Sequence, residues 1–232
     1  MKNKFWEDFW NKSAKEHEDV RFIAGWGNRT FQEMLLMIVE LAKKLELKYK
    51  DRLLDAGCGP GIFEIAYSPY VREIYAIDFS EEMLKINKKY TKNLSNVIVR
   101  KATINDLPFS DDFFDKILVN SVVQYLRDLN EVEEALEEIG RVARKRAKIL
   151  VSRVPDASKK DDYIREYYKL NLSDKEIRKK TYIVNKCLWF DKNDVIEIGK
   201  KVGFETKVLG VMKNVWWSKY YFDILFTKRC TK

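Results

Sequence analysis

A glycine-rich turn between a short apolar segment and a helical segment is the feature that most limits how this chain can fold. Residues 53–61 read Leu-Leu-Asp-Ala-Gly-Cys-Gly-Pro-Gly, and apolar residues at helical spacing follow over 62–67. Glycine lets the backbone approach a ligand closely, and the first N–H groups of the next helix have no partner inside that helix. A strand, a glycine turn and a helix in this order predict a βαβ unit, but dinucleotide folds and phosphate loops both use such a turn.

Short apolar runs alternate with amphipathic segments before and after this turn. The pattern predicts strands at 52–56, 73–77, 97–100, 116–120 and 148–151, and helices at 30–47, 62–67, 81–90 and 129–144. Strands that are buried on both faces and separated by helices are typical of a parallel sheet. A further helix at 192–202 precedes two strand-like runs, 204–211 and 220–227, which predict an antiparallel hairpin. We expect an α/β fold: a doubly wound, mostly parallel seven-stranded sheet with a C-terminal antiparallel hairpin and helices on both faces.

The length of the chain, 232 residues, suits one decorated domain. We expect residues 1–48 to form an N-terminal helical cap. Residues 155–189 contain no strand-like run and many Lys, Asp and Tyr residues, so we expect a mostly helical insertion that forms a lid over the ligand site. With 46% apolar and 34% charged residues, the composition is that of a globular protein.

Membrane, disulfide and metal sites are not indicated. The richest apolar run, 34–41, is far shorter than the roughly 18 residues of a membrane span, and the first ten residues lack a signal-peptide core. We therefore expect a cytoplasmic protein. Cys58, Cys187 and Cys230 are far apart and form no CxxC pair, so we expect reduced thiols. The single histidine, His17, leaves no histidine cluster for a metal.

The residues around the turn indicate the charge of its ligand. No Gly-Lys-Ser/Thr sequence is present to hold a triphosphate, and Asp55 before the first glycine would repel a pyrophosphate. An acidic turn suits a cationic or zwitterionic ligand instead. The next expected strand ends at Asp78, about 20 residues further on, where a carboxylate can accept hydrogen bonds from both ribose hydroxyls.

Three segments carry a family resemblance. In chain order they read Leu-Asp-Ala-Gly-Cys-Gly-Pro-Gly, Ala-Ile-Asp-Phe-Ser-Glu-Glu-Met-Leu and Leu-Pro-Phe-Ser-Asp-Asp-Phe-Phe-Asp. They resemble the motifs of class I S-adenosylmethionine-dependent methyltransferases, and the resemblance extends over about residues 52–228. It implies S-adenosyl-L-methionine as the cofactor and a Rossmann-like fold.

The resemblance also implies roles for individual residues. Gly57 and Gly59 would approach the methionine part of the cofactor, Asp78 would bind the ribose, and Phe79 with Met83 would flank the adenine. Phe79 and Met83 can equally be core residues, and Asp78 can be a helix cap near Ser80. The remaining cofactor-binding candidates are Asp55, Thr103, Ile104 and Asn120.

The sequence departs from the family near the adenine. The family often has an acidic residue four positions before the Leu of the Leu-Pro-Phe motif, and this chain has Thr103 there. We expect Thr103 and the N–H of Ile104 near the adenine ring.

Catalytic residues are harder to assign, because methyl transfer from a sulfonium mainly requires alignment and exclusion of water. Gln124 and Tyr125 follow the fourth expected strand and are candidates to orient the acceptor, although either can be a packing residue. His17 lies in a segment that resembles the N-terminal helix of the family, which often closes over the cofactor; a surface or packing role is the alternative.

The positive charge of the chain is local. The net charge is +8, and residues 141–180 contain 14 Lys plus Arg against 6 Asp plus Glu, which equals the whole surplus. A solvated helical face explains most of these residues. If some face inward, they favour an anionic acceptor, phosphorylated, carboxylated or sugar-linked. Its candidate contacts are then Arg153, Tyr163, Arg165, Tyr167 and Trp217, with Lys169 and Tyr168 nearby.

The leading hypothesis is a methyltransferase that acts on an oxygen or nitrogen of a small-molecule acceptor. Methylation of RNA is the alternative among enzymes, because of the charge and the aromatic residues. A cofactor-binding scaffold without activity is the alternative outside enzymes. The acceptor, a general base and the oligomeric state do not follow from the sequence.

Overall fold

A computed structural model describes residues 4–27, 29–212 and 215–229. In these residues seven strands form one sheet in the order β3-β2-β1-β4-β5-β7-β6. Strands β1 to β5 are parallel, and β7 pairs antiparallel with both β5 and β6. The doubly wound, mostly parallel sheet and its C-terminal antiparallel hairpin are therefore confirmed. The strands are β1 (Arg52–Ala56), β2 (Glu73–Asp78), β3 (Val97–Lys101), β4 (Phe114–Asn120), β5 (Ala143–Pro155), β6 (Phe204–Gly210) and β7 (Tyr221–Lys228).

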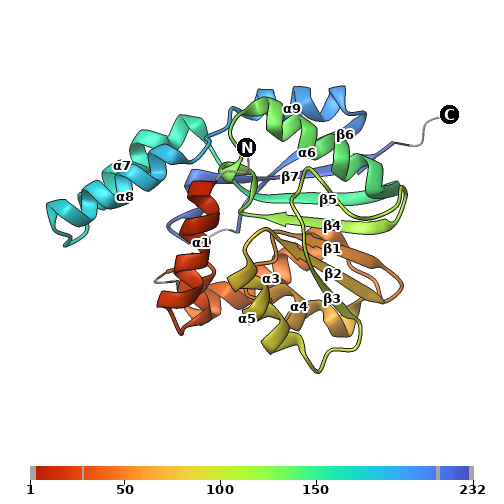
Figure 1. The fold of residues 1–232 in the computed structure, drawn as a ribbon. Helices are drawn as coiled ribbons and strands as arrows, with labels where there is room; N and C mark the ends of the chain where they lie inside the picture. Colours follow the sequence, from red (N-terminus) through yellow and green to blue (C-terminus); the bar gives the residue numbers. More distant parts are fainter. Residues whose placement is uncertain (1–3, 28, 213–214, 230–232) are drawn as a thin grey trace.

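Helices cover both faces of the sheet (Figure 1). Neighbouring strand residues point to opposite faces, so Leu53 packs with α3 and α4, and Leu54 packs with α6. The α-helices are α1 (Lys4–Glu16), α2 (Val20–Ile23), α3 (Phe31–Leu45), α4 (Ile62–Tyr67), α5 (Glu81–Thr91), α6 (Leu129–Val142), α7 (Lys160–Tyr167), α8 (Asp174–Lys186) and α9 (Lys192–Lys201). Short 3₁₀ helices are η1 (Ser68–Tyr70), η2 (Val123–Tyr125), η3 (Ala157–Lys159) and η4 (Ser218–Tyr220).

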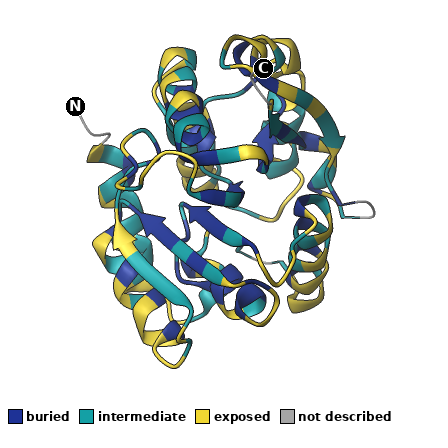
Figure 2. Cartoon of the chain, turned by 90° about the vertical axis from the view of Figure 1, so that its right-hand side faces the viewer, coloured by how far each residue is buried: buried dark blue, intermediate teal, exposed yellow. Residues whose placement is uncertain are grey.

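The central strands form the core between these two helical layers. Figure 2 shows buried residues concentrated along the strands, with exposed residues on the outer helix faces. Two large clusters of buried apolar residues result, one on each face of the sheet. Among the described residues no helix is long and apolar enough to cross a membrane.

Strand β5 is longer than the sequence pattern predicts. The expected strand was 148–151, whereas the structure extends it to Ala143 and Pro155. The first half of the strand was not predicted, because the charged residues at 144–146 interrupt the apolar pattern. In the second half, the pairing with β7 shifts in register between Val151 and Val154. The backbone at Arg153 is left-handed, with a φ of 59°.

The segment 155–189 is mostly helical, as α7 and α8 show. The two helices lie side by side and project from the body as an arm (Figure 1). The base of the arm meets α1, where the ring of Tyr182 lies 6.1 Å from that of Phe5.

Candidate cofactor and acceptor site

Two adjoining cavities lie where the parallel strands end. The larger has a volume of about 580 Å³ and the smaller about 80 Å³. Both are lined by residues that follow β1, β2 and β4: Gly57, Asp78, Phe79, Val122 and Tyr125. This is the edge at which open α/β sheets bind their ligands.

The glycine turn forms a wall of both cavities. Gly57 has a φ of +89°, and a Cβ atom added there would lie 2.2 Å from Cγ2 of Val122. The N–H groups of Gly57 and Cys58 donate to the carbonyl of Ile77, at 2.8 and 2.9 Å. The turn therefore needs glycine at position 57 both for its backbone conformation and for the contact with Val122.

Asp78 connects the turn to the second strand. Its carboxylate accepts hydrogen bonds from the N–H of Gly59, at 3.0 Å, and from the N–H of Ser80, at 2.8 Å. Ser80, not Asp78, caps α5, because its hydroxyl accepts from the N–H of Met83. Burial raises the pKa of Asp78 to about 6, although these backbone donors oppose the shift.

A pair of buried carboxylates lies behind the turn. Asp55 and Glu64 are fully shielded from solvent, and neither lines a cavity. Burial raises the pKa of Asp55 to about 7, and burial followed by the negative charge of Asp55 raises the pKa of Glu64 well above its usual value. In the described ranges, neither these two carboxylates nor that of Asp78 forms an ion pair. The carboxyl groups behind the turn therefore have no cationic side chain as a partner in the described part of the chain.

The larger cavity is lined by three of the four residues expected at the adenine, and the fourth, Met83, lines only the smaller cavity. Phe79, Thr103 and Ile104 line the larger cavity, and Ile104 is almost fully buried. Thr103 forms an isolated β-bridge with Asp106, which lines the same cavity. The structure thus places an acidic side chain three residues after the position where the family often has one, and our sequence reasoning missed it.

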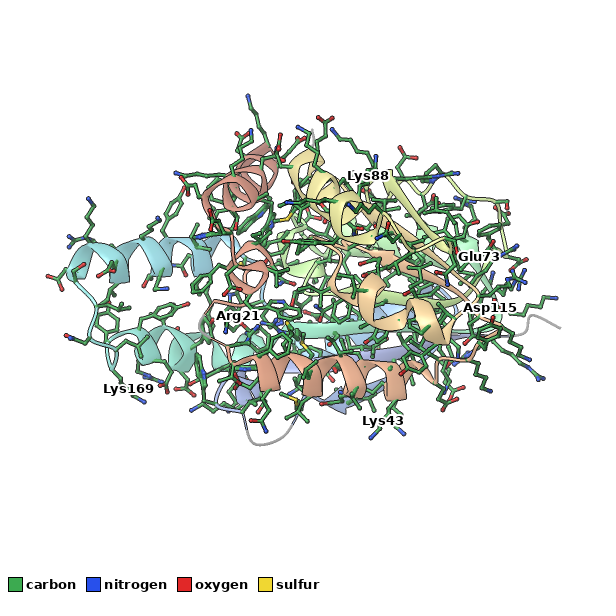
Figure 3. All side chains as sticks on the ribbon, turned by 90° about the horizontal axis from the view of Figure 1, so that it is seen from below. Arg21, Lys43, Glu73, Lys88, Asp115 and Lys169 are labelled. Atoms are coloured by element: carbon green, nitrogen blue, oxygen red, sulfur yellow. The ribbon has the colours of Figure 1, made fainter. Side chains whose placement is uncertain are left out.

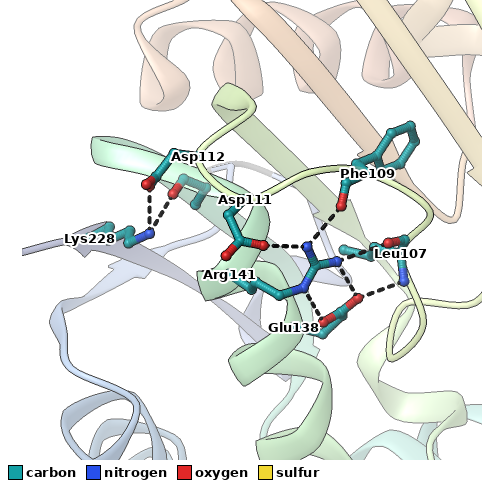
Figure 4. Close-up of polar contacts among 8 residues, drawn as sticks. Leu107, Phe109, Asp111, Asp112, Glu138, Arg141 and Lys228 are labelled. Atoms are coloured by element: carbon teal, nitrogen blue, oxygen red, sulfur yellow. Dashed lines mark hydrogen bonds and ion pairs between the residues drawn. The ribbon is translucent and has the colours of Figure 1, made fainter.

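Arg141 holds the loop that follows this wall (Figure 4). Its guanidinium donates to the carbonyl oxygens of Leu107 and Phe109, at 2.9 and 2.8 Å, and pairs with Asp111 and Glu138. Glu138 also accepts from the N–H of Leu107, at 2.8 Å. One arginine therefore links helix α6 to the loop beside the larger cavity.

The smaller cavity adjoins the glycine turn. Met83 and Asn120 line it, together with Trp10, Trp26 and Ser121. Oδ1 of Asn120 and Oγ of Ser121 are buried and have no hydrogen-bond partner. These atoms are available to a polar ligand, and the two tryptophans were not among our candidates.

Tyr125 lies at the junction of the two cavities. Its ring centroid is 4.5 Å from that of Trp6 and 5.4 Å from that of Trp10, both on α1. The Gln124 side chain forms a hydrogen bond with the Tyr125 hydroxyl, and burial raises the pKa of this phenol. Gln124 itself is buried and lines neither cavity.

Several predicted site residues lie away from the cavities. His17 is exposed at the end of α1, with its ring 5.6 Å from that of Phe22. Arg165 is exposed and pairs with Asp162. Lys169, labelled at the end of the arm in Figure 3, is exposed and pairs with Glu166 at 2.9 Å.

The cysteines that the structure describes are free thiols. Cys58 lines the smaller cavity, and Cys187 follows α8. Cys230 lies outside the described residues.

The other acceptor candidates gather near the end of β5. Tyr163 lies 5.5 Å from Tyr167 and 6.1 Å from Tyr221, measured between ring centroids. The guanidinium carbon of Arg153 is 5.0 Å from the ring centroid of Trp217. Arg29 also contacts this indole, at 4.3 Å, and our sequence reasoning missed it because it belongs to the loop before α3.

The residues present fit the cofactor that the resemblance implies. Asp78 can accept from ribose hydroxyls, and Phe79 and Ile104 offer apolar surface to an adenine. The buried acids near the glycine turn suit a sulfonium and an ammonium group, and Asn120 Oδ1 is an acceptor without a partner. Among the described residues no cluster of potential metal ligands is present.

Comparison with known families identifies the type of domain. Residues 54–151 match the family model described as a methyltransferase domain. The chain is similar to an uncharacterized methyltransferase, YcgJ, of Bacillus subtilis, with 30% identity over 143 residues that cover 61% of this chain and 52% of the relative. It is also similar to the demethylmenaquinone methyltransferase of Staphylococcus carnosus, with 33% identity over 116 residues that cover 49% and 47%. The matches therefore span about half the length of these curated relatives.

Solved structures share the fold. The structure of YcgJ from Bacillus subtilis has a TM-score of 0.63 at 18% identity and covers 85% of this chain and all of that one. A phosphoethanolamine N-methyltransferase of Haemonchus contortus, in complex with phosphoethanolamine and S-adenosylhomocysteine, has a TM-score of 0.71 at 15% identity. It covers 99% of this chain, which spans 49% of that one. At these identities the likeness concerns the fold alone.

Proposed function

Because the chain contains a class I S-adenosylmethionine-dependent methyltransferase domain, we propose that it transfers a methyl group to an oxygen or nitrogen of a small-molecule acceptor. One observation supports the cofactor most directly: the glycine turn and the carboxylate of Asp78 meet at two adjoining cavities that are backed by unpaired acids. Such a site favours a ligand that combines a ribose with positive charge.

We assign the binding of the cofactor to residues of both cavities. When bound, S-adenosylmethionine supplies an electrophilic methyl group on a sulfonium. Asp78 accepts hydrogen bonds from the ribose hydroxyls. Phe79, Thr103 and Ile104 contact the adenine. Gly57 and Asn120 contact the methionine part. Asp55 and Glu64 make no direct contact with the cofactor, and they supply negative potential behind the turn when the pair ionises.

The acceptor side of the site aligns the reactants and excludes water. Tyr125 lies between the two cavities, so its hydroxyl is placed to orient an acceptor, and Gln124 positions that hydroxyl. Trp6 and Trp10 of α1 pack against Tyr125, and they line the larger and the smaller cavity respectively. Alignment of this kind lowers the barrier without a covalent role for the protein.

Incubation with methyl-labelled S-adenosylmethionine tests the proposal. The purified protein is given separate pools of metabolites, RNA and protein from a cell extract, and the label is counted in each. We expect label among small molecules and loss of transfer in Asp78→Asn. Label only in RNA would replace the small-molecule acceptor by RNA, and binding of cofactor without transfer to any pool would indicate a scaffold.

A further inference from the structure

Two arginine side chains from distant segments contact one buried indole. The guanidinium carbon of Arg29 lies 4.3 Å from the ring centroid of Trp217, and that of Arg153 lies 5.0 Å from it. Arg153 is also 5.3 Å from the ring of Tyr221. Trp217 and Arg153 are both buried, with exposed fractions of 1% and 6%. The tertiary structure therefore brings two positive charges together, with Arg153 buried and Arg29 partly buried.

Neither guanidinium has a carboxylate partner among the residues that the structure describes. Asp223 is the acid next to Arg153, but its Oδ1 accepts from the N–H of Arg153 at 2.8 Å and from the hydroxyl of Ser152 at 2.9 Å. Its Oδ2 pairs with Lys44 at 2.6 Å. Both oxygens of the Asp223 carboxylate therefore bind other groups, and neither accepts a hydrogen bond from the guanidinium of Arg153.

Specific nitrogen atoms are left without an acceptor. Nη1 of Arg29 and Nε of Arg153 are buried and form no hydrogen bond. Burial, followed by the charge of Arg153, lowers the pKa of Arg29 to about 9, and the distant Glu33 opposes this shift only weakly. Contact with an indole stabilises a cation but supplies no hydrogen-bond acceptor. Buried, unpaired charges of one sign cost free energy unless an anion joins them.

Residues close to both arginines line the smaller cavity: Trp26, whose carbonyl accepts from the N–H of Arg29 at 3.4 Å, and Asn120 and Ser121 near Arg153. The two arginines themselves line neither cavity. Ser152, which precedes Arg153, pairs with Asn120 across the sheet, and the N–H of Ser121 donates to the carbonyl of Ser152 at 2.9 Å. The phenols of Tyr163 and Tyr221 share a hydrogen bond beside Arg153, and both phenols stay neutral because burial raises the pKa of each.

We propose that Arg29 and Arg153 form an oxyanion subsite that binds a carboxylate or phosphate group of the methyl acceptor. Guanidinium groups bind these oxyanions through charge-assisted hydrogen bonds, and the two unpartnered nitrogens are the donors. The acceptor class is thereby narrowed to small molecules that carry such a group. The inference rests on the proposed methyltransferase function, because the subsite is assigned to the acceptor by its position next to the cavity of the methyl donor.

Binding of inorganic phosphate tests the subsite without any catalysis. The protein is saturated with S-adenosylhomocysteine and titrated with phosphate at constant ionic strength, with chloride as the reference ion. We expect millimolar binding of phosphate that weakens at least tenfold in Arg153→Gln and Arg29→Gln and is unchanged in Arg178→Gln, an exposed arginine of α8. Equal effects of phosphate and chloride on wild type overturn the proposal.

A second arm separates the acceptor from the cofactor, which carries a carboxylate of its own. Affinities for S-adenosylhomocysteine and for methylthioadenosine, which lacks the amino-acid part, are compared in both arginine variants. We expect less than a twofold change for either ligand. A loss of affinity for S-adenosylhomocysteine alone would place the carboxylate of the cofactor on these arginines and overturn the acceptor subsite.

The wild-type protein provides a measurement that does not depend on a folded variant. Nε–H signals of arginine in nitrogen-15 NMR spectra should shift when phosphate is added, and signals that shift only as they do with chloride contradict the proposal. If phosphate binds but no labelled methyl group is transferred to any pool, the proposed function fails and the oxyanion site remains. If methyl groups are transferred without phosphate binding, the subsite fails and the function remains.

Discussion

The carboxylate of Asp78 accepts a hydrogen bond from the N–H of Gly59 at 3.0 Å. This bond joins the end of β2 to the turn that follows β1, so the group that would bind a ribose also fixes the glycine turn. The backbone donor holds the carboxylate in its charged form, against the effect of burial.

Replacement of Asp78 by Asn should weaken cofactor binding by about 10- to 100-fold, because a charged hydrogen-bond acceptor becomes neutral. The dissociation constant of S-adenosylhomocysteine, measured by calorimetry, is the readout. The matched control is Asp194→Asn, at an exposed position of α9 that lines neither cavity. An affinity equal to that of the control would mean that Asp78 does not bind the cofactor.

Replacement of Gly57 by Ala should destabilise the protein by about 2 kcal/mol or more, because the new Cβ would lie 2.2 Å from Val122 Cγ2 and the φ of +89° disfavours alanine. Chemical denaturation measures the change. Gly210→Ala is the control, since no atom lies within 4 Å of its added Cβ and its φ is not positive. The double variant Gly57→Ala, Val122→Ala should regain part of the lost stability. If it does not, the close contact with Val122 is not the cause of the destabilisation.

The Asp55 and Glu64 pair should make stability depend on pH. Burial raises the pKa of Asp55 from 3.8 to about 7, so the folded state binds more protons than the unfolded chain between about pH 4 and pH 7. The contribution of the pair to the free energy of unfolding is therefore complete below about pH 4 and is lost as the pH rises to about 7. In Glu64→Gln, with one acid removed, the free energy of unfolding should fall less over this range. Parallel pH profiles of the two proteins would contradict this assignment.

The same pair should link cofactor binding to proton release. A sulfonium near these acids favours their ionised forms, so the affinity for S-adenosylmethionine should rise between about pH 5 and pH 7. The affinity for methylthioadenosine, which carries no positive charge, should rise less over this range, because for this ligand only the ionisation of Asp78 contributes. Calorimetry in buffers of different ionisation enthalpy measures the protons released, and equal pH dependence of the two ligands would exclude a role for the charge.

Replacement of Arg141 by Met should release the loop after the larger cavity. The guanidinium binds two carbonyl oxygens and two carboxylates, and its loss should cost about 1–3 kcal/mol of stability and weaken adenosine binding. Arg141→Lys should restore little, because an ammonium group cannot reach the same set of acceptors. Hydrogen exchange of the amides at 107–111 is the readout, and unchanged protection there would show that Arg141 is dispensable.

Two of the acceptor candidates, Arg165 and Lys169, lie away from the cavities and form ion pairs with acids close by in the sequence. Arg165 and Lys169 each pair with an acid three residues earlier, Asp162 and Glu166, on their own helix or just beyond it. Contacts at this spacing form within a helical segment whatever the rest of the chain does. The charge of the segment 141–180 therefore did not predict which of its residues are exposed, and of the candidates Arg153, Arg165 and Lys169 only Arg153 is buried.

The sequence by itself determined the order of strands and helices and the position of the glycine turn. The strand 52–56 was predicted with its observed ends, because apolar runs, an acid and a glycine turn are local signals. The tertiary structure alone decided which side chains share a cavity or a buried charge. Arg29, Arg153 and Trp217 lie far apart in the chain, and they meet because the loop before α3, the end of β5 and the β6–β7 connection pack at one edge of the sheet. Such contacts depend on long-range packing, which no local pattern encodes.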